Sequence, residues 1–442
     1  MSRTDSTAST AAADREPATR PSRERDRRLK PRERRRLAVL GLPTLGFALA
    51  ITTVSSYLPV VASGFIGSSA LIGLLIGGEG FMALFVPLIV GVWSDRLKTR
   101  LGGRLPFVLA ATPVMALTLV SMGLVRSLGP IAAALAVFFV AYYVGYEPYR
   151  ALYPDLFAES VAGRSQANQA VWRGLGTIGA LVSGGLLLSA ATFLPFVSSA
   201  LVLGVAVGLF AALIAATSDL TAQDRPGQVG VRDAAGRLLG LLRKHPALRT
   251  YLAANALWEL SLGGLKTFIV LYVTRGLGYS LSAASLIIGV VALVVLGGAL
   301  GSGKLADRIG RLRTMHLGLW IYGVTLAIPI FTAEPAVIGA AAPVIALGGG
   351  MIMSLPYAIL MPLMPESEHG SLTGFYSLSR GVGTMLGPLL AGLCVQALGG
   401  PFEATEGYAA MWIVCSGAIL GSIPVLRRLW GQSGDRARLR GE

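Results

Sequence analysis

The stretch GKLADRIGRLR (residues 303–313) places five charged side chains between two long apolar runs of the sequence. A shorter version, GVWSDR (residues 91–96), stands 212 positions earlier and also follows an apolar run. Two more pairs of segments recur in the same order at nearly the same offset: EPYRAL (147–152) with LPYAIL (355–360), and RGLGT (173–177) with RGVGT (380–384). Three such pairs indicate that the chain contains two copies of one structural unit.

The apolar runs around these segments have the length of membrane spans. A helix needs about 20 mostly apolar residues to cross a bilayer. Only 14% of the 442 residues are charged, against about 25% in soluble domains. Twelve windows qualify as spans, roughly 39–61, 69–92, 106–125, 131–152, 168–190, 193–215, 251–273, 281–303, 314–332, 336–361, 372–398 and 408–427. The sequence therefore predicts an all-α membrane protein with twelve transmembrane helices in two parallel six-helix repeats.

One polar segment separates the two repeats. Residues 216–249 carry Pro, Gly and charged side chains and follow the sixth window, so we expect a cytosolic linker there. The first residues are rich in Arg, Ser, Asp and Glu, a composition typical of disorder. The predicted divisions are a disordered basic cytosolic tail at 1–37, a first bundle at 38–215, the linker, a second bundle at 250–430 and a cytosolic tail at 431–442.

The basic residues predict the topology. If both termini are cytoplasmic, 33 of the 38 Lys and Arg residues lie on the cytoplasmic side, and only Arg126 and Arg275 lie outside. Lys and Arg concentrate in cytoplasmic loops of membrane proteins. We therefore expect a multi-pass protein of the plasma (inner) membrane, surrounded by lipid and monomeric. The net charge of +15 follows from this topology and does not indicate nucleic-acid binding.

Residue types that catalyse reactions or bind metals are not grouped in the sequence. His245, His316 and His369 are scattered, and Cys394 and Cys415 both fall within predicted spans. These spacings match no metal or nucleophile motif. We expect no metal, no cofactor and no enzyme activity.

The repeated loops resemble those of a known family. Residues 303–313 look very like the signature loop of the major facilitator superfamily. Three segments resemble the sucrose carriers and the glycoside–pentoside–hexuronide:cation symporters: SDRLKTRLGGRLPF (94–107), PYRALYPDL (148–156) and GRSQANQAVWRGLGTIG (163–179). The resemblance implies twelve helices, alternating access, and uptake of a sugar or glycoside with H+ or Na+. Residues 137–145 lack the acid of the plant-type sucrose carriers, so the coupling carboxylate is sought elsewhere.

The residues of these loops are expected to form a conformational switch. Carboxylates and guanidinium groups near helix ends can pair in one state of a transport cycle and separate in the other. Glycine at the same place permits close approach of two helices. The residues concerned are Gly91, Asp95, Arg96, Arg100, Arg104, Asp155, Gly303, Asp307, Arg308 and Arg311.

Six ionisable residues fall within the predicted spans: Glu79, Glu147, Arg173, Glu259, Lys266 and Arg380. Each such group costs about 2.5–3.5 kcal/mol at the centre of an inserted helix, so these groups usually pair or line a water-filled cavity. Depth along the helices predicts three pairs, Glu147 with Arg173, Glu259 with Arg380, and Glu79 with Lys266. Arg150, one turn on from Glu147, could share the first of these pairs. A structural role in holding helices together is one reading of these pairs, and a role in coupling or substrate binding is the other.

For the second reading, we expect Glu79 or Glu259 to carry a coupled proton. Arg380 would pair with that acid or orient substrate hydroxyls, and Trp258 would stack on a sugar ring. Two functions follow from the sequence. One is uptake of a sugar or glycoside coupled to H+ or Na+, which the resemblance across about 94–180 favours. The alternative is proton-coupled export of drugs or hydrophobic metabolites.

Overall fold

The computed structural model describes residues 31–97, 99, 101–156, 162–217, 236, 240–363 and 372–432. Twelve helical spans in this part of the chain are long and apolar enough to cross a membrane, as the sequence predicts. The first six are α1 (Pro31–Ala62), α2 (Ser69–Arg96), α3 (Leu105–Leu124), α4 (Leu128–Leu156), α5 (Ala162–Ala190) and α6 (Leu194–Thr217). The second six are α8 (Pro246–Leu271), α9 (Leu281–Ile309), α10 (Arg311–Leu326), α12 (Pro335–Ser354), α14 (Leu372–Ala397) and α15 (Met411–Gln432).

Short elements extend the spans of the second half. α8 continues into the π turn η2 (Tyr272–Gly276), and α10 is followed by α11 (Ile328–Phe331). η3 (Met361–Leu363) follows α13, while η5 (Glu403–Thr405) and η6 (Tyr408–Ala410) precede α15. α13 (Pro356–Leu360) is separated from α12 because Pro356 has no N–H for the helical ladder. α1 and α8 both begin with proline, at a position where the missing N–H costs no intrahelical bond. Most of the predicted tails and linker lies outside the described residues.

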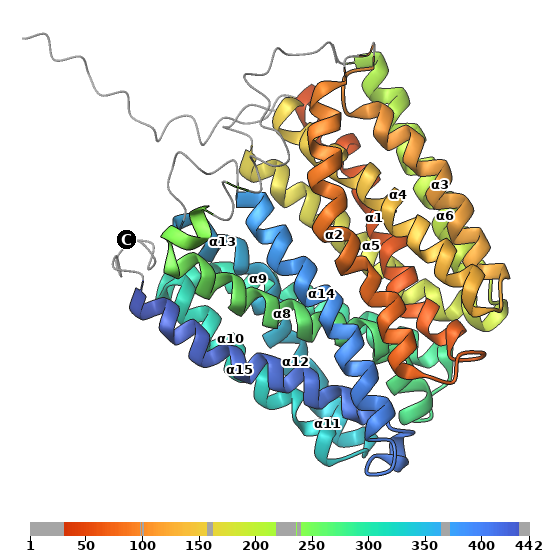
Figure 1. Ribbon diagram of the computed structural model, residues 1–442, viewed down its shortest axis with the longest axis vertical. Helices are drawn as coiled ribbons and strands as arrows, with labels where there is room; N and C mark the ends of the chain where they lie inside the picture. The colour runs from red at the N-terminus through yellow and green to blue at the C-terminus, as the bar shows by residue number, and fades with distance from the viewer. Residues whose placement is uncertain are drawn as a thin grey trace, which may run out of the picture.

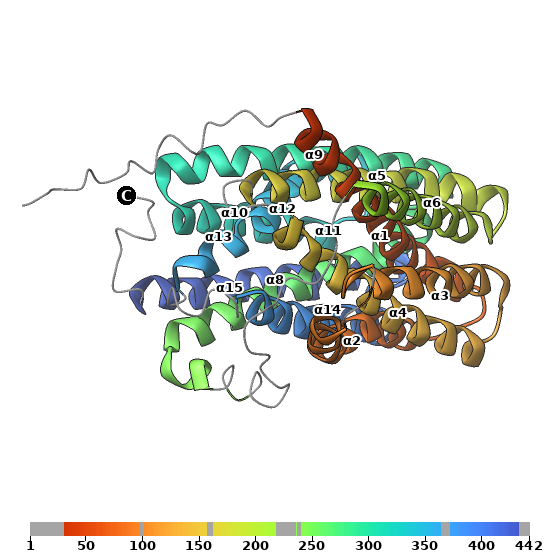
Figure 2. The same ribbon diagram turned by 90° about the horizontal axis from the view of Figure 1, so that it is seen from above.

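The two halves form two bundles that lie side by side (Figure 1). α1–α6 make the N-terminal bundle and α8–α15 the C-terminal bundle. They meet through equivalent pairs of helices, α2 with α14 and α5 with α9, as the view from above also shows (Figure 2). Each bundle has its own buried aromatic core, with Phe47, Tyr149 and Phe210 in the first and Tyr251, Trp258 and Phe268 in the second.

Hydrogen bonds join the bundles at one end, the end that carries the loops after α1 and α14, which we term the closed end. Ser68 Oγ donates to Gln396 Oε1 over 2.6 Å. Deeper between the bundles, Tyr57 Oη lies 2.8 Å from Ser285 Oγ. Tyr57 also donates to the carbonyl oxygen of Leu181, so its hydroxyl connects α1, α5 and α9.

Small residues allow α2 and α14 to meet along the closed end. A Cβ added at Gly77 would lie 2.6 Å from the carbonyl oxygen of Met385, a distance that real Cβ atoms do not show. A Cβ at Gly73 or Gly80 would also collide with the backbone of α14. These three positions share one face of α2, because residues three and four apart in a helix are neighbours. Glycine on this face therefore sets the distance between the bundles.

The other ends of the bundles lie apart, and we term this the open end. Figure 1 shows the helices of the two bundles diverging toward the loop between α2 and α3. A Cβ added at Gly91 of α2 or at Gly303 of α9 would have no atom within 4 Å. The close helix approach predicted at these two glycines is therefore not found, because the bundles are separated where the glycines lie.

The hydroxyl of Tyr57 gives a first test of the closed end. Tyr57→Phe removes the hydrogen bonds to Ser285 and Leu181 while keeping the ring, and buried hydrogen bonds between membrane helices contribute about 0.6 kcal/mol on average. We expect the closed end to open about threefold more often. Spin labels on Gly67→Cys and Gly400→Cys, two loop positions with open space for a side chain, measure this as a larger long-distance population.

The matched control is Tyr272→Phe. Tyr272 lies at the same end but contacts Trp412 of its own bundle, with ring centroids 5.3 Å apart. Both native cysteines, Cys394 and Cys415, are first replaced by alanine. An unchanged distance distribution in Tyr57→Phe would show that its hydroxyl does not hold the bundles together.

Candidate functional site

The RGLGT and RGVGT segments occupy equivalent places on α5 and α14. The first glycine of each segment faces the other bundle, Gly174 toward α9 and Gly381 toward α2. The second glycine packs on the first helix of its own bundle, Gly176 on α1 and Gly383 on α8. Each segment therefore lies where helices of the two bundles meet. The arginine that opens each segment faces the space between the bundles.

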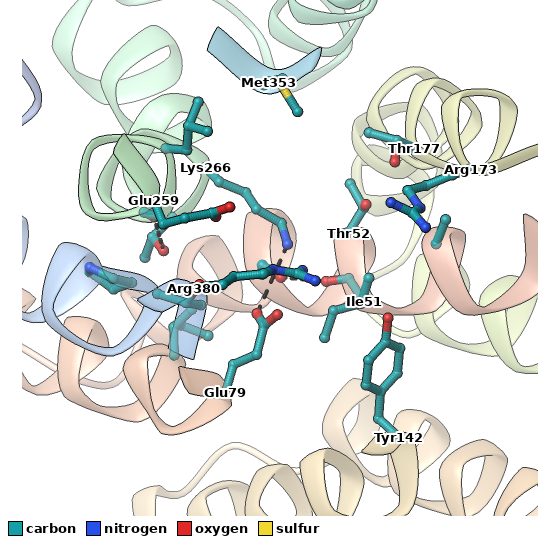
Figure 3. Close-up of a pocket in the computed structure, with 18 of the residues that line it drawn as sticks. Ile51, Thr52, Glu79, Tyr142, Arg173, Thr177, Glu259, Lys266, Met353 and Arg380 are labelled. Carbon is teal, nitrogen blue, oxygen red and sulfur yellow. Dashed lines mark hydrogen bonds and ion pairs between the residues drawn. The ribbon is translucent and has the colours of Figure 1, made fainter. Parts of the chain in front are cut away.

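A cavity of about 940 Å³, including the space at its open side, lies between the two bundles (Figure 3). Its charged lining residues are Glu79, Arg173, Glu259, Lys266 and Arg380. These are five of the six ionisable residues that the sequence places within spans. Helices of both bundles contribute them, so the cavity changes shape when the bundles move.

Glu79 and Lys266 form an ion pair between the bundles. Glu79 Oε2 on α2 lies 4.0 Å from Lys266 Nζ on α8, as depth along the helices predicts. The Glu79 side chain is 3% exposed, whereas that of Lys266 is 35% exposed. The carboxylate is therefore held in the protein while the ammonium group reaches into the cavity.

Glu259 and Arg380 lie together in the C-terminal bundle. Tyr376 Oη donates to Glu259 Oε1 over 3.3 Å. Both residues line the cavity, but no ion pair within 4.0 Å joins Glu259 and Arg380, so this predicted pair is not closed in the described part of the structure. Figure 3 shows Arg380 reaching from α14 past Glu259 and Glu79 toward Ile51 and Thr52 of α1. Arg380 thus lies within reach of groups from both bundles.

The predicted pair of Glu147 with Arg173 does not form. Arg150, one turn along the same helix, donates to Glu147 Oε1 over 3.3 Å instead. Arg173 donates from Nη2 to Tyr146 Oη over 3.1 Å and lines the cavity, while Glu147 does not. Arg150, which the sequence offered as a second partner in this pair, takes the carboxylate as its i,i+3 neighbour, and Arg173 does not.

Trp258 also differs from its predicted role. Its side chain is 1% exposed, its Nε1 donates to Ser422 Oγ over 2.9 Å, and its ring meets Tyr251 edge-on. The ring is part of the C-terminal core and cannot stack on a ligand. The aromatic side chains that line the cavity are Tyr142 and Tyr146, whose rings stack with centroids 5.1 Å apart.

The sequence reasoning singled out ionisable residues within the spans and therefore missed the Ser and Thr hydroxyl groups that line the cavity. α1 provides Thr44, Thr52 and Ser55, and the threonines that close RGLGT and RGVGT provide Thr177 and Thr384. Two signals in the sequence point to them. The run TTVSS (52–56) is a polar cluster inside an apolar span, and both copies of the repeated segment end in threonine.

The switch loops contain one contact that both repeats share. Arg311 donates from Nη1 to the carbonyl oxygen of Ala358 over 3.1 Å, and Arg104 donates to that of Ala151. Each donor and acceptor are 47 residues apart, and the two contacts differ by 207 positions. Each arginine therefore ties its loop to the end of the fourth span of its own repeat.

The other switch residues are described only in part. Asp307 and Arg308 are exposed at the end of α9, and Arg96 ends α2. The side chains of Asp95 and Asp155 and the whole of Arg100 lie outside the described residues. Their part in a switch stays a prediction.

The comparisons with known proteins agree with this architecture. The family model described as Major Facilitator Superfamily matches residues 40–311 and 259–441. The uncharacterized MFS-type transporter YwfA of Bacillus subtilis is 27% identical over 191 residues, 42% of this chain and 38% of that protein. Multidrug resistance protein MdtG of Escherichia coli is 25% identical over 184 residues, 40% and 43%. The matched stretches thus span about two fifths of these relatives.

Two solved structures share the fold over nearly their whole length. The nucleoside transporter NupG has a TM-score of 0.70 at 14% identity, covering 90% of this chain and 99% of that one. A bacterial homologue of the lysosomal transporter Spinster, in an inward-facing and unoccupied conformation, has a TM-score of 0.69 at 16% identity, covering 92% and 97%. With its two matched halves, its twelve spans and a cavity between the bundles, the chain belongs to the major facilitator superfamily.

Proposed function

We propose that this transporter couples uptake of a hydroxylated solute, a sugar or glycoside, to the entry of protons by alternating access. The observation that carries the proposal is the composition of the cavity lining, in which hydroxyl groups from five spans (α1, α4, α5, α8 and α14) surround five charged side chains. Hydroxyl and charged groups discriminate strongly in favour of solutes that satisfy their hydrogen bonds. The resemblance of residues 94–179 to sugar symporters supports the same substrate class.

Proton coupling is supported by the position of Glu79. A buried carboxylate that loses its cationic partner takes up a proton, and the partner of Glu79 lies in the other bundle. When the bundles rock past each other, the distance between Glu79 and Lys266 changes. Glu259 is the second candidate, because it shares a cavity face with Lys266.

The distribution of basic residues indicates which side of the membrane the open end faces. The loop after α2 and the junction of α9 with α10 at Gly310 lie at the open end. Lys and Arg are frequent in the sequence at both places. The concentration of basic residues in cytoplasmic loops then places the open end in the cytoplasm. We therefore propose that the structure is the inward-facing state of a plasma-membrane protein with cytoplasmic termini.

Export of lipophilic compounds is the second candidate function. The similarity to MdtG, which is named a multidrug resistance protein, supports it. Apolar side chains such as Ile51, Ile76, Leu262 and Met353 also line the cavity. The five charged groups nevertheless favour a polar solute.

A liposome assay separates the two functions. Purified full-length protein is reconstituted with a trapped pH dye, and sucrose, maltose, trehalose, methyl glucoside and glucuronate are added in turn. Acidification inside on addition of one solute is the expected result, and a protonophore should remove it. If no solute gives a response with H+ or Na+ present, the proposal is wrong, and efflux of lipophilic cations along an imposed pH gradient would then support export.

A further inference from the structure

A basic cluster lies on the surface of the C-terminal bundle where α10 packs against α15. It consists of Arg313, His316 and Arg427, which we term the α10/α15 cluster, and the cavity lining contains none of these residues. Both arginines are exposed and lie near the open-end limits of their spans, Arg311–Phe331 and Tyr408–Gly431. Neither arginine forms an ion pair with an acidic residue that the structure describes.

The packing of the two helices brings His316 and Arg427 to the same depth. A Cβ added at Gly323 of α10 would lie 2.7 Å from Leu420 Cδ2 of α15, so the helices touch there. His316 precedes Gly323 by seven residues and Arg427 follows Leu420 by seven, so each lies two turns, or about 10.5 Å, nearer the open end. A step of seven residues also returns a side chain to the same helix face. His316 and Arg427 therefore face each other within electrostatic range, and Arg313 lies one turn further on.

Exposed apolar side chains continue this surface toward the interior of the membrane. Trp320, one turn from His316, is 43% exposed and donates from Nε1 to His316 Nε2 over 3.2 Å. Leu317 and Val324 are also exposed on α10. Tryptophan is enriched at the depth where lipid headgroups meet acyl chains. The surface therefore offers positive charge at headgroup depth and apolar atoms directly below it.

The α10/α15 cluster belongs to the second repeat alone. The equivalent helices of the first repeat, α3 and α6, also pack together. Their open-end segments, residues 105–112 and 210–217, contain no Lys, Arg or His. Arg104, just before α3, corresponds to Arg311, and each of these two donates to a carbonyl oxygen of its own bundle. The repeated fold therefore does not require the basic residues of the cluster.

We propose that the α10/α15 cluster binds the headgroup phosphate of an anionic phospholipid, whose acyl chains lie along Trp320 and Leu317. Guanidinium groups match phosphate oxygens with paired hydrogen bonds. Basic residues between spans attract anionic lipids. A zwitterionic lipid carries its own cation beside the phosphate and gains less from a positive surface. The site lies outside the cavity, so the proposal goes beyond the proposed function and does not depend on which solute is transported.

Native mass spectrometry of the purified full-length protein tests this preference. Delipidated protein in a neutral detergent is titrated with phosphatidylglycerol, or with phosphatidylcholine of the same acyl chains. The fraction of protein that carries one lipid is measured at each concentration. We expect phosphatidylglycerol to bind about tenfold more tightly, because two arginines contribute to its attraction.

Double variants assign the preference to the cluster. Arg313→Gln with Arg427→Gln should bring the two lipids to within about twofold of each other, whereas lysine at both positions should keep most of the preference because it keeps the charge. The matched control is Arg243→Gln with Lys244→Gln, which removes two positive charges from exposed positions just before α8 and should keep the preference. Cooperative thermal unfolding shows that each variant is folded.

Three results would overturn the inference. The first is equal binding of the two lipids to the unchanged protein. The second is a preference that survives the glutamine double variant, which would assign the binding to another basic part of the sequence. The third is an equal loss in the control, which would show a response to total charge. The liposome assay reports solute and proton movement, so its failure is seen separately from any of these.

Discussion

Glu79→Gln is expected to abolish accumulation of solute against its gradient while leaving exchange of solute across the membrane intact. A pH difference of about two units can drive about a hundredfold accumulation with one proton per solute, because each unit is worth about 1.36 kcal/mol. Glutamine keeps the size of the side chain and cannot release or accept the coupled proton. The variant should therefore bring the solute only to equal concentrations on both sides.

Radiolabelled uptake into liposomes under an imposed pH gradient measures the accumulation, and exchange without a gradient shows that the variant is folded. Glu403→Gln, in the exposed 3-10 turn η5, is the control and should accumulate solute normally. Glu259→Gln is measured alongside. If Glu79→Gln and Glu259→Gln both retain full accumulation, neither carboxylate carries the proton.

The fold could be predicted from the sequence because similar segments recur in its two halves. Three pairs of segments recur at nearly the same offset, 207 to 212 residues, and hydropathy places the spans between them. The structure also shows equivalent contacts in the two repeats that the sequence alone does not reveal. Arg104 and Arg311 each contact the fourth span of their own repeat. The distance between the bundles could not be predicted, because one sequence must permit both states of an alternating-access cycle. The separation at Gly91 and Gly303 belongs to this state.

The cavity could be predicted only as far as depth and helical phase allow. Glu259 and Lys266 are seven residues apart and therefore share one face of α8, and both line the cavity. Trp258 precedes Glu259 by one residue, a rotation of about 100° around a helix of 3.6 residues per turn. This rotation turns the Trp258 ring away from the side chain of Glu259, and the structure places the ring in the core of the C-terminal bundle. The expected stacking on a sugar failed because the ring packs on Tyr251 and its Nε1 donates to Ser422.

The glycine face of α2 gives the second large effect. Gly77→Leu introduces four carbon atoms where even a Cβ would lie 2.6 Å from the carbonyl oxygen of Met385 on α14. Overpacking of this kind costs about 1–3 kcal/mol, and that cost falls only on the state in which α2 and α14 touch. A difference of this size changes the ratio of the two states by about 5- to 150-fold. We expect the closed end to be open in most molecules.

The labels on Gly67→Cys and Gly400→Cys measure this directly, as a shift of the main distance to a longer value. Gly208→Leu is the control, since Gly208 is exposed on α6 and a Cβ there meets no atom within 4 Å. Thermal unfolding of both variants separates a shift between states from loss of the fold, because a shifted protein still unfolds cooperatively. A short distance retained in a folded Gly77→Leu variant would show that the glycine face does not set the separation of the bundles. A long distance would mean that close packing of α2 on α14 is itself what keeps this side of the cavity shut.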